Sequence, residues 1–145
     1  MPITFTNNFK NILDKLQSVL RTEFGNTLPV YVGEVNEKAG SQYLRLDPVG
    51  SELVEYNVNA ELREFTINFF LYFGDKSDSR TKLDAVLRLV SRIEALIHDN
   101  VTLTLSDSSS LFNNRFETTL LDAIEDSENY VVQFEFRGQH LGNLD

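Results

Sequence analysis

The sequence predicts an α+β fold: a single antiparallel or mixed β-sheet with two long amphipathic helices packed on it and a C-terminal β-hairpin. Two stretches have apolar residues at helical spacing, and the other segments alternate apolar and polar residues as half-buried strands do. The order is one helix, several strands, a second helix and more strands. At 145 residues we expect a single domain over 1–145, with a short flexible tail at about 139–145.

The first predicted helix runs from about Asn8 to Phe24. Its apolar residues form one narrow stripe at a period of 3.6: Phe9, Ile12, Leu13, Leu16, Val19 and Leu20. Gly25 follows, as is typical where a helix ends. We expect this helix to lie on a surface with one face covered.

Short β segments are predicted at residues 29–34 and 42–46, on either side of a turn-rich loop at 36–41. A long strand is predicted from about residue 53 to 73. Its two halves alternate on different phases, which predicts a bulge or sharp bend near Arg63 and Glu64.

The end of this long strand carries large apolar side chains on both faces, namely Phe69, Phe70, Tyr72 and Phe73. Two interpretations remain open. The strand is central and buried on both faces, or its end is covered by another copy of the protein.

The second predicted helix begins after Asp78 or Ser79, either of which can cap it, and runs to about Asp99. Its apolar residues are Leu83, Val86, Leu87, Val90, Ile93 and Ile97, with Leu89 and Leu96 widening the stripe. Leu87 and Val90 are expected at the centre of that stripe. So wide a stripe predicts burial against the sheet and against either the first helix or a neighbouring subunit.

A strand is predicted at 101–105, followed by a loop at 106–110 that we expect to be mobile. Residues 115–124 could be strand or helix. We predict a strand, because the polar turn at 125–129 leads into a clear strand from Tyr130, and the two would form a hairpin.

Composition excludes several classes of site. There is no cysteine, and two histidines leave little for a zinc site. No signal peptide is evident, and the longest apolar run, residues 69–73, is too short to span a membrane, so we expect a soluble protein. A net charge of −9 argues against binding a nucleic-acid backbone or an anionic membrane surface.

No catalytic, cofactor-binding or metal-binding residue is predicted, and no cofactor. His98 is interpreted as a solvated cation at a helix C-terminus, and His140 as an exposed residue of the tail. The carboxylates Asp122, Glu125, Asp126 and Glu128 are interpreted as a solvated acidic turn, because no calcium-loop pattern accompanies them. Residues 74–77 end like a phosphate-binding loop, but the earlier glycine is missing. We therefore predict that the protein is not an enzyme.

The element order resembles that of the tail terminator and tail-completion proteins of long-tailed bacteriophages. The resemblance rests on the first helix, the long strand ending at residues 65–72, the helix to Asp99 and the final hairpin ending at residues 130–136. It implies a homo-oligomeric ring, usually a hexamer, that caps the tail tube and docks it to the head connector. The implied partners are further copies of the chain, the tail tube protein and the connector or neck protein.

The resemblance also implies a virion protein of the phage tail or neck, assembled in the host cytoplasm. Genomic DNA would pass through the ring without specific binding, which agrees with the acidic balance. Two alternatives stay open: a neck or head-completion adaptor, and an acidic DNA-mimic protein. The basic residues Lys82, Arg88 and Arg92 on the second helix argue against the mimic.

Overall fold

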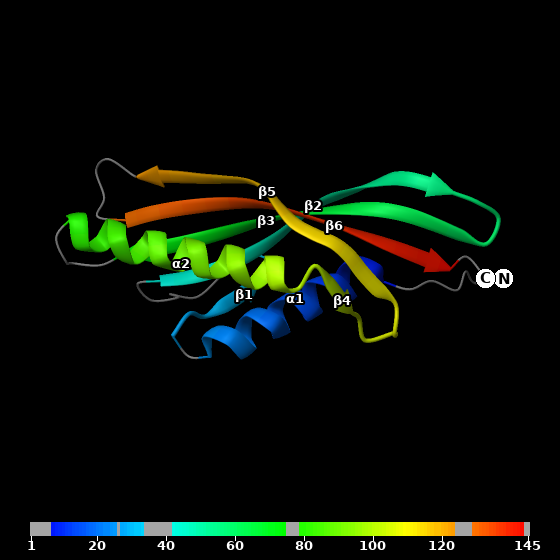
Figure 1. The fold of residues 1–145 in the computed structure, drawn as a ribbon, viewed down its shortest axis with the longest axis horizontal. Coiled ribbons are helices and arrows are strands. Elements are labelled where there is room, and N and C mark those ends of the chain that lie inside the picture. The colour runs from blue at the N-terminus through cyan, green and yellow to red at the C-terminus, as the bar shows by residue number, and fades with distance from the viewer. Residues whose placement is uncertain (1–6, 26, 34–41, 75–78, 124–128, 144–145) are drawn as a thin grey trace.

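The computed structural model describes residues 7–25, 27–33, 42–74, 79–123 and 129–143 (Figure 1). Its elements are α1 (Asn8–Phe24), β1 (Val30–Val32), β2 (Gln42–Tyr56), β3 (Ala60–Gly74), α2 (Ser79–Asp99), β4 (Thr102–Thr104), β5 (Ser110–Ala123) and β6 (Asn129–Asn143). None of the described helices is long and apolar enough to cross a membrane.

The strands form one sheet in the order β1-β2-β3-β6-β5-β4. β1 and β2 are parallel, and the other pairs are antiparallel. Strands make up 55% of the described residues, and the sheet curls into a mixed half-barrel. The predicted fold class, a sheet with two long helices packed on it, is therefore wrong. Four strands of 14 or 15 residues dominate the molecule, and a twisted sheet of that length curls around its own core.

The core lies on the inner face of this curl. Alternate residues of β3, from Phe65 to Phe73, point inward and are buried. They meet their partners on β6 in register, with Phe69 opposite Phe134 and Leu71 opposite Val132. β3 is a central strand, since it pairs with β2 on one side and β6 on the other, but burial on both faces is not borne out, because Phe70 and Tyr72 on its outer face are only partly buried.

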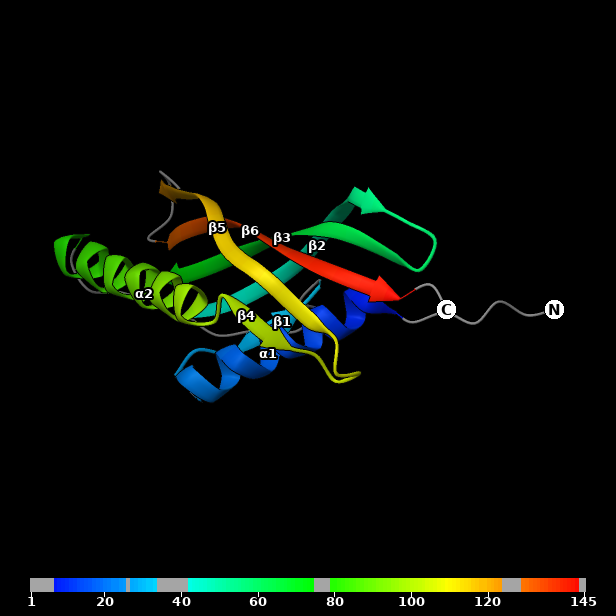
Figure 2. The ribbon, with the colours of Figure 1, turned by 45° about the vertical axis from the view of Figure 1, so that its right-hand side comes forward.

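The helix α1 lies across the open side of the curl (Figure 2). The side chain of Asn7 caps it by accepting from the backbone N–H of Lys10. Toward one sheet edge, the side chains of Gln17 and Arg21 both donate to the carbonyl oxygen of Val30 on β1. Its buried stripe includes Ile12, Leu13, Leu16, Leu20 and Phe24, much as its periodicity predicts.

The helix α2 buries Val86, Val90, Ile93 and Ile97. The expectation for Leu87 is wrong, because its side chain is 45% exposed. The buried line follows offsets of four, three and four from Val86, and Leu87 lies about 100° around the helix from Val86. Arg92 joins the two helices, since its guanidinium bonds to the Glu23 carboxylate at 2.9 Å and lies over the Phe24 ring.

The predicted strand over 53–73 is interrupted, and the predicted bend at Arg63 and Glu64 is wrong. The chain reverses at residues 57–59, where the Asn57 side chain accepts from the backbone N–H groups of Asn59 and Ala60. β3 then pairs with β6 without a register shift. The change of phase between Leu62 and Phe65 therefore lies within one regular strand: Ala60 and Leu62 are on the face opposite Phe65 and Ile67.

β5 and β6 pair as an antiparallel hairpin, so the predicted strand after Arg115 is confirmed up to Ala123. Ile124 and the acidic turn lie outside the described residues. A flexible tail beginning at 139 is wrong: β6 continues to Asn143 and pairs with β3 along its whole length.

Candidate assembly surfaces

The two histidines lie in different settings. His98 is exposed in the last turn of α2, in agreement with its interpretation as a solvated residue. His140 is only 3% exposed, so its interpretation as an exposed tail residue is wrong. It lies on β6, and its ring packs edge-to-face with the Phe65 ring.

The turn between β4 and β5 covers His140. The Ser109 hydroxyl lies 2.9 Å from His140 Nε2 and also bonds to the Asp107 carboxylate. That carboxylate can only accept, so Ser109 donates to Asp107 and accepts from His140. Burial lowers the pKa of His140, and the bond from Ser109 lowers the pKa of Asp107.

These hydrogen bonds attach the turn between β4 and β5 to β6 and do not form a catalytic arrangement. In a nucleophilic triad the histidine accepts the serine proton and the carboxylate orients the histidine. Here the serine proton faces the carboxylate, and the imidazole N–H faces the serine oxygen. The loop at 106–110, expected to be mobile, is thus held by its own side chains and by the backbone bond from Leu105 N–H to Ser109 O.

Asn114 is a second buried polar residue, which the sequence did not reveal. Its amide nitrogen donates to the carbonyls of Asn100 and Leu111 and so joins the end of α2 to β5. Gly138 lies beside it: a Cβ there would come within 2.5 Å of Asn114 Oδ1. Gly138 is thus required by close packing.

No group of three or more His, Cys, Asp or Glu within the described ranges could hold a metal ion. Of the acidic cluster, Glu125, Asp126 and Glu128 lie outside those ranges. So do residues 75–77 of the phosphate-loop-like segment.

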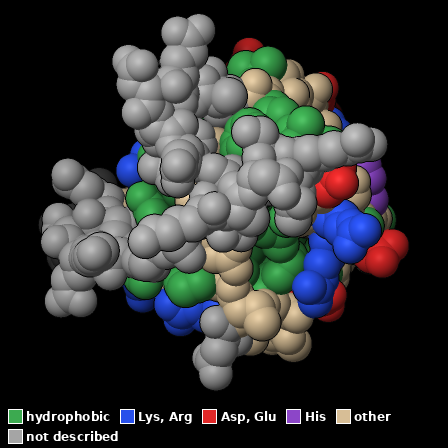
Figure 3. Space-filling model, turned by 90° about the vertical axis from the view of Figure 1, so that its left-hand side faces the viewer, with side chains coloured by type: hydrophobic (Ala, Val, Ile, Leu, Met, Phe, Trp, Pro, Cys, Tyr) green, Lys and Arg blue, Asp and Glu red, His purple; other side chains and the backbone are tan. Residues whose placement is uncertain are grey.

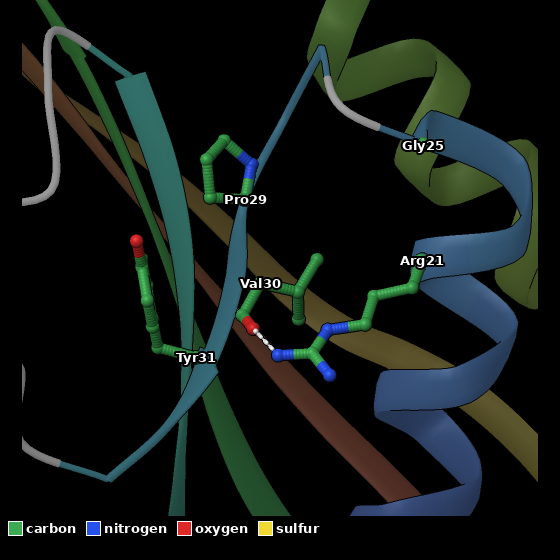
Figure 4. Close-up of a pocket in the computed structure, with 5 residues that line it drawn as sticks. All are labelled: Arg21, Gly25, Pro29, Val30 and Tyr31. Carbon is green, nitrogen blue, oxygen red and sulfur yellow. Dashed lines mark hydrogen bonds between the residues drawn. The ribbon is translucent and has the colours of Figure 1, made fainter.

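One surface hollow, of about 370 Å³, lies between α1 and β1 (Figure 4). Arg21, Gly25, Pro29, Val30 and Tyr31 line it. The Arg21 guanidinium already bonds to the Val30 carbonyl at 3.1 Å. A second hollow lies between α1 and the end of β4, where Ser106 donates weakly to Asn11 at 3.4 Å. Both hollows are open grooves along α1.

The outer face of the sheet carries a network of ion pairs. The carboxylate of Glu64 on β3 pairs with both Arg137 of β6 and Arg115 of β5, and its side chain is only 14% exposed. The side chains around Arg63 and Glu64 are therefore engaged in contacts within the chain. The loop at 106–110 is tied to His140, and the loop at 36–41 lies outside the described residues.

The most exposed apolar side chains lie at one end of the sheet, on the second half of β2 and the following turn (Figure 1). We call residues 49–59 the hairpin end. Tyr56 is 64% exposed and Val58 87%, and Val49, Leu53 and Val54 are also exposed. A β-ribbon with both faces bare gains little from packing, and exposed apolar groups gathered in one place mark interaction surfaces.

Further exposed apolar side chains lie on other elements: Leu87 on α2, and Leu120 and Leu121 on β5. Leu120 pairs with Gln133 and Leu121 pairs with the buried Val132, so these two consecutive residues point to opposite faces of the sheet. Figure 3 faces the end opposite the hairpin end and shows hydrophobic side chains with charged side chains nearby. Among the described residues, exposed apolar side chains therefore gather at the hairpin end.

No family profile matches the chain, and no curated protein matches it significantly. Several solved structures share its fold, and two of them are described below. One is a chain of the virion of a native gene transfer agent particle, with a TM-score of 0.56 and 17% identity over 92% of this chain and 93% of that one. The other, whose description states no function, has a TM-score of 0.57 and 15% identity over 96% of this chain and 97% of that one. At these identities the likeness establishes the fold: this chain is built like a chain of that virion over nearly its whole length.

Proposed function

We propose that this chain is a structural subunit of a phage-like virion. More narrowly, it is a ring-forming tail terminator that caps the tail tube and docks it to the head connector. The observation that carries the proposal is the fold shared over 92% of the chain with a chain of a gene transfer agent virion. The resemblance of the element order to tail terminators points to the same class.

The exposed surfaces are consistent with such a role. A closed ring uses head-to-tail contacts, so each subunit must present two different patches. The hairpin end supplies one exposed apolar surface, and Leu87, Leu120 and Leu121 expose further apolar side chains on other elements. The ring would be a hexamer, as in the proteins that the chain resembles.

The charge of the chain suits a conduit for DNA. At −9, the protein repels phosphates, so DNA would pass through the lumen of the ring without specific binding. The partners would be the tail tube protein below and the connector above, and the chemistry would be assembly without catalysis.

A neck or head-completion adaptor is the second candidate, because the description of the virion chain names the particle and not the place within it. Electron microscopy of particles assembled without this protein tests both. A terminator predicts overlong or headless tails. An adaptor predicts tails of normal length with unattached or leaking heads. Complete, infectious particles would refute both placements.

A further inference from the structure

One edge of β2 is bare along the hairpin end. β1 pairs with β2 only at residues 44–46, and no described strand pairs with that edge of β2 from residue 47 to 56. The unpaired backbone N–H and C=O groups of such an edge are a template for another strand. Leu53 and Tyr56 both point to the inner face of the sheet, because their partners on β3 lie an even number of residues from the buried Phe65. A strand added at this edge would cover both apolar side chains.

The charge of the hairpin end limits which strand can be added. Glu52 and Glu55 lie on its outer face, and residues 49–61 contain no lysine or arginine. Two β2 edges paired with each other would bring the glutamates of both copies together, and like charges across strands are destabilising. The uncovered part of β5 carries Glu117 and Asp122 and is disfavoured for the same reason. The strand that suits this edge is apolar on one face and free of acidic side chains.

Residues 1–6 have that composition. The sequence Ile3-Thr4-Phe5-Thr6 alternates apolar and polar residues, and its β-branched and aromatic side chains favour strands. None of the six side chains is charged. Paired with the bare edge, the two apolar side chains would cover Leu53 and Tyr56, and the threonine hydroxyls would face the glutamates of the outer face as hydrogen-bond donors.

The same chain cannot supply this strand at a useful length. α1 begins near the end of β6, where the side-chain nitrogen of Asn8 lies 3.8 Å from the position of a Cβ at Gly142 (Figure 2). Gly142 pairs with Glu61 of β3, and Glu61 pairs with Tyr56 of β2. A strand added at the bare edge therefore lies three strand spacings from Gly142, about 14 Å. An extended chain needs about four residues to cross that span, which leaves about two of the six for pairing.

We infer that residues 1–6 of one copy pair with the bare β2 edge at the hairpin end of the next copy, an inference that deepens the proposed ring and rests on it. Each copy gives one strand and receives one at a different surface, so the contact is head to tail, as a closed ring requires. Main-chain hydrogen bonds attach the added strand, and the burial of Leu53 and Tyr56 makes the contact specific. A second copy is the occupant because the chain carries both the bare edge and a strand that fits it, but cannot join the two within itself.

Cysteine cross-linking tests this exchange, because the chain has no cysteine of its own. Phe5→Cys and Leu53→Cys chains, carrying tags of different mass, are mixed at high concentration with a bifunctional thiol reagent. We expect dimers that contain one chain of each kind, and none from either variant alone. Asp14→Cys, on the exposed face of α1, replaces Phe5→Cys in the control mixture and should give no dimer. No dimer in the test mixture, or an equal yield in the control, would overturn the inference.

An added negative charge gives a second readout on the same pair of cysteines. Ile3→Asp, in the Phe5→Cys chain, brings an acidic side chain to the acidic hairpin end and should lower the cross-linking yield several-fold. Val101→Asp makes the same kind of change at an exposed site between α2 and β4 and should leave the yield unchanged. Equal losses would assign the effect to net charge and count against the exchange.

Deletion of residues 2–6 separates this inference from the proposed function. We expect the shortened chain to remain folded, because the described core begins after these residues, and to lose assembly. An oligomer that still forms after the deletion would defeat the exchange and leave the proposed ring intact. Particles complete without the protein would defeat the proposed function whatever the cross-links show.

Discussion

β2 and β3 are each packed at one end of the sheet and bare, or nearly so, at the other. In the body of the molecule, Leu44 and Leu46 of β2 are fully buried against α1 and the inner face of β3. Farther along the same strand, Leu53 and Tyr56 are exposed, although the strand pairing continues past them. The backbone pairing is the same in both halves of β2, but only the first half is covered by other elements of the chain. Hydrogen bonding alone thus extends the hairpin, and burial against the helices and the rest of the sheet stabilises only the body.

The largest expected difference is between aromatic residues of the two regions. Phe134 on β6 is fully buried among Phe116 and its neighbours, so Phe134→Ala should lower the free energy of unfolding by about 3–5 kcal/mol. Tyr56→Ala at the hairpin end should change it by no more than about 0.5 kcal/mol. Denaturant titration of both variants measures this. Similar losses would mean that the hairpin end is packed in the monomer.

The buried and exposed sides of α2 allow a second comparison of two variants. Ile93→Ala should cost about 2–5 kcal/mol, because Ile93 is fully buried. Leu87→Ala should cost well under half as much, because water already reaches that side chain. Denaturant titration of both variants measures the two changes. A larger loss of stability for Leu87→Ala than for Ile93→Ala would show that the helix is rotated from the orientation described.

Two glycines, one in the body and one at the hairpin end, allow a third comparison. Gly138→Ala places a Cβ against Asn114 Oδ1 and should cost about 1–3 kcal/mol through overpacking. Gly50→Ala, at the start of the hairpin end, meets no atom within 4 Å and should leave stability unchanged or slightly raised. Thermal melts of the pair test this, and equal melting temperatures would contradict the close contact at Gly138.

The smallest effect expected is a pH dependence located in the body. Burial puts the pKa of His140 in the folded protein below its ordinary value of 6.5. As the pH falls through 6.5, the unfolded chain therefore takes up a proton before the folded one, and stability declines until the folded pKa is passed. Unfolding titrations at several pH values between 7.5 and 5 should show this decline. His140→Gln should flatten it, and an unchanged slope in that variant would assign the decline to other groups.

Local patterns predicted the parts of the fold that depend on local spacing. The span of α1, the helix ending at Asp99 and the pairing of the last two strands follow from periodicities of 3.6 and 2. The turn at residues 57–59 was missed because Asn57 and Asn59 also fit an alternating strand, and the Asn57 side-chain bonds that close the turn carry no periodic signal.

The setting of His140 could not be predicted from its neighbours in sequence. Its burial depends on Ser109, 31 residues earlier, which a turn brings over it. The apolar surfaces were beyond prediction for the same kind of reason. Leu53 and Leu44 look alike in the sequence, and only the position of α1 and the other strands determines which one is covered.

Hydrogen exchange, followed in the free protein and in the protein assembled in particles, tests most directly whether the body is the scaffold and the hairpin end the assembly element. Amides of β3 and β6 at the centre of the sheet should exchange slowly in both states. Amides of residues 51–56 should exchange rapidly in the free protein, since they lie in a hairpin with little cover, and slowly in the assembly. Equal exchange of those amides in the two states would contradict the account.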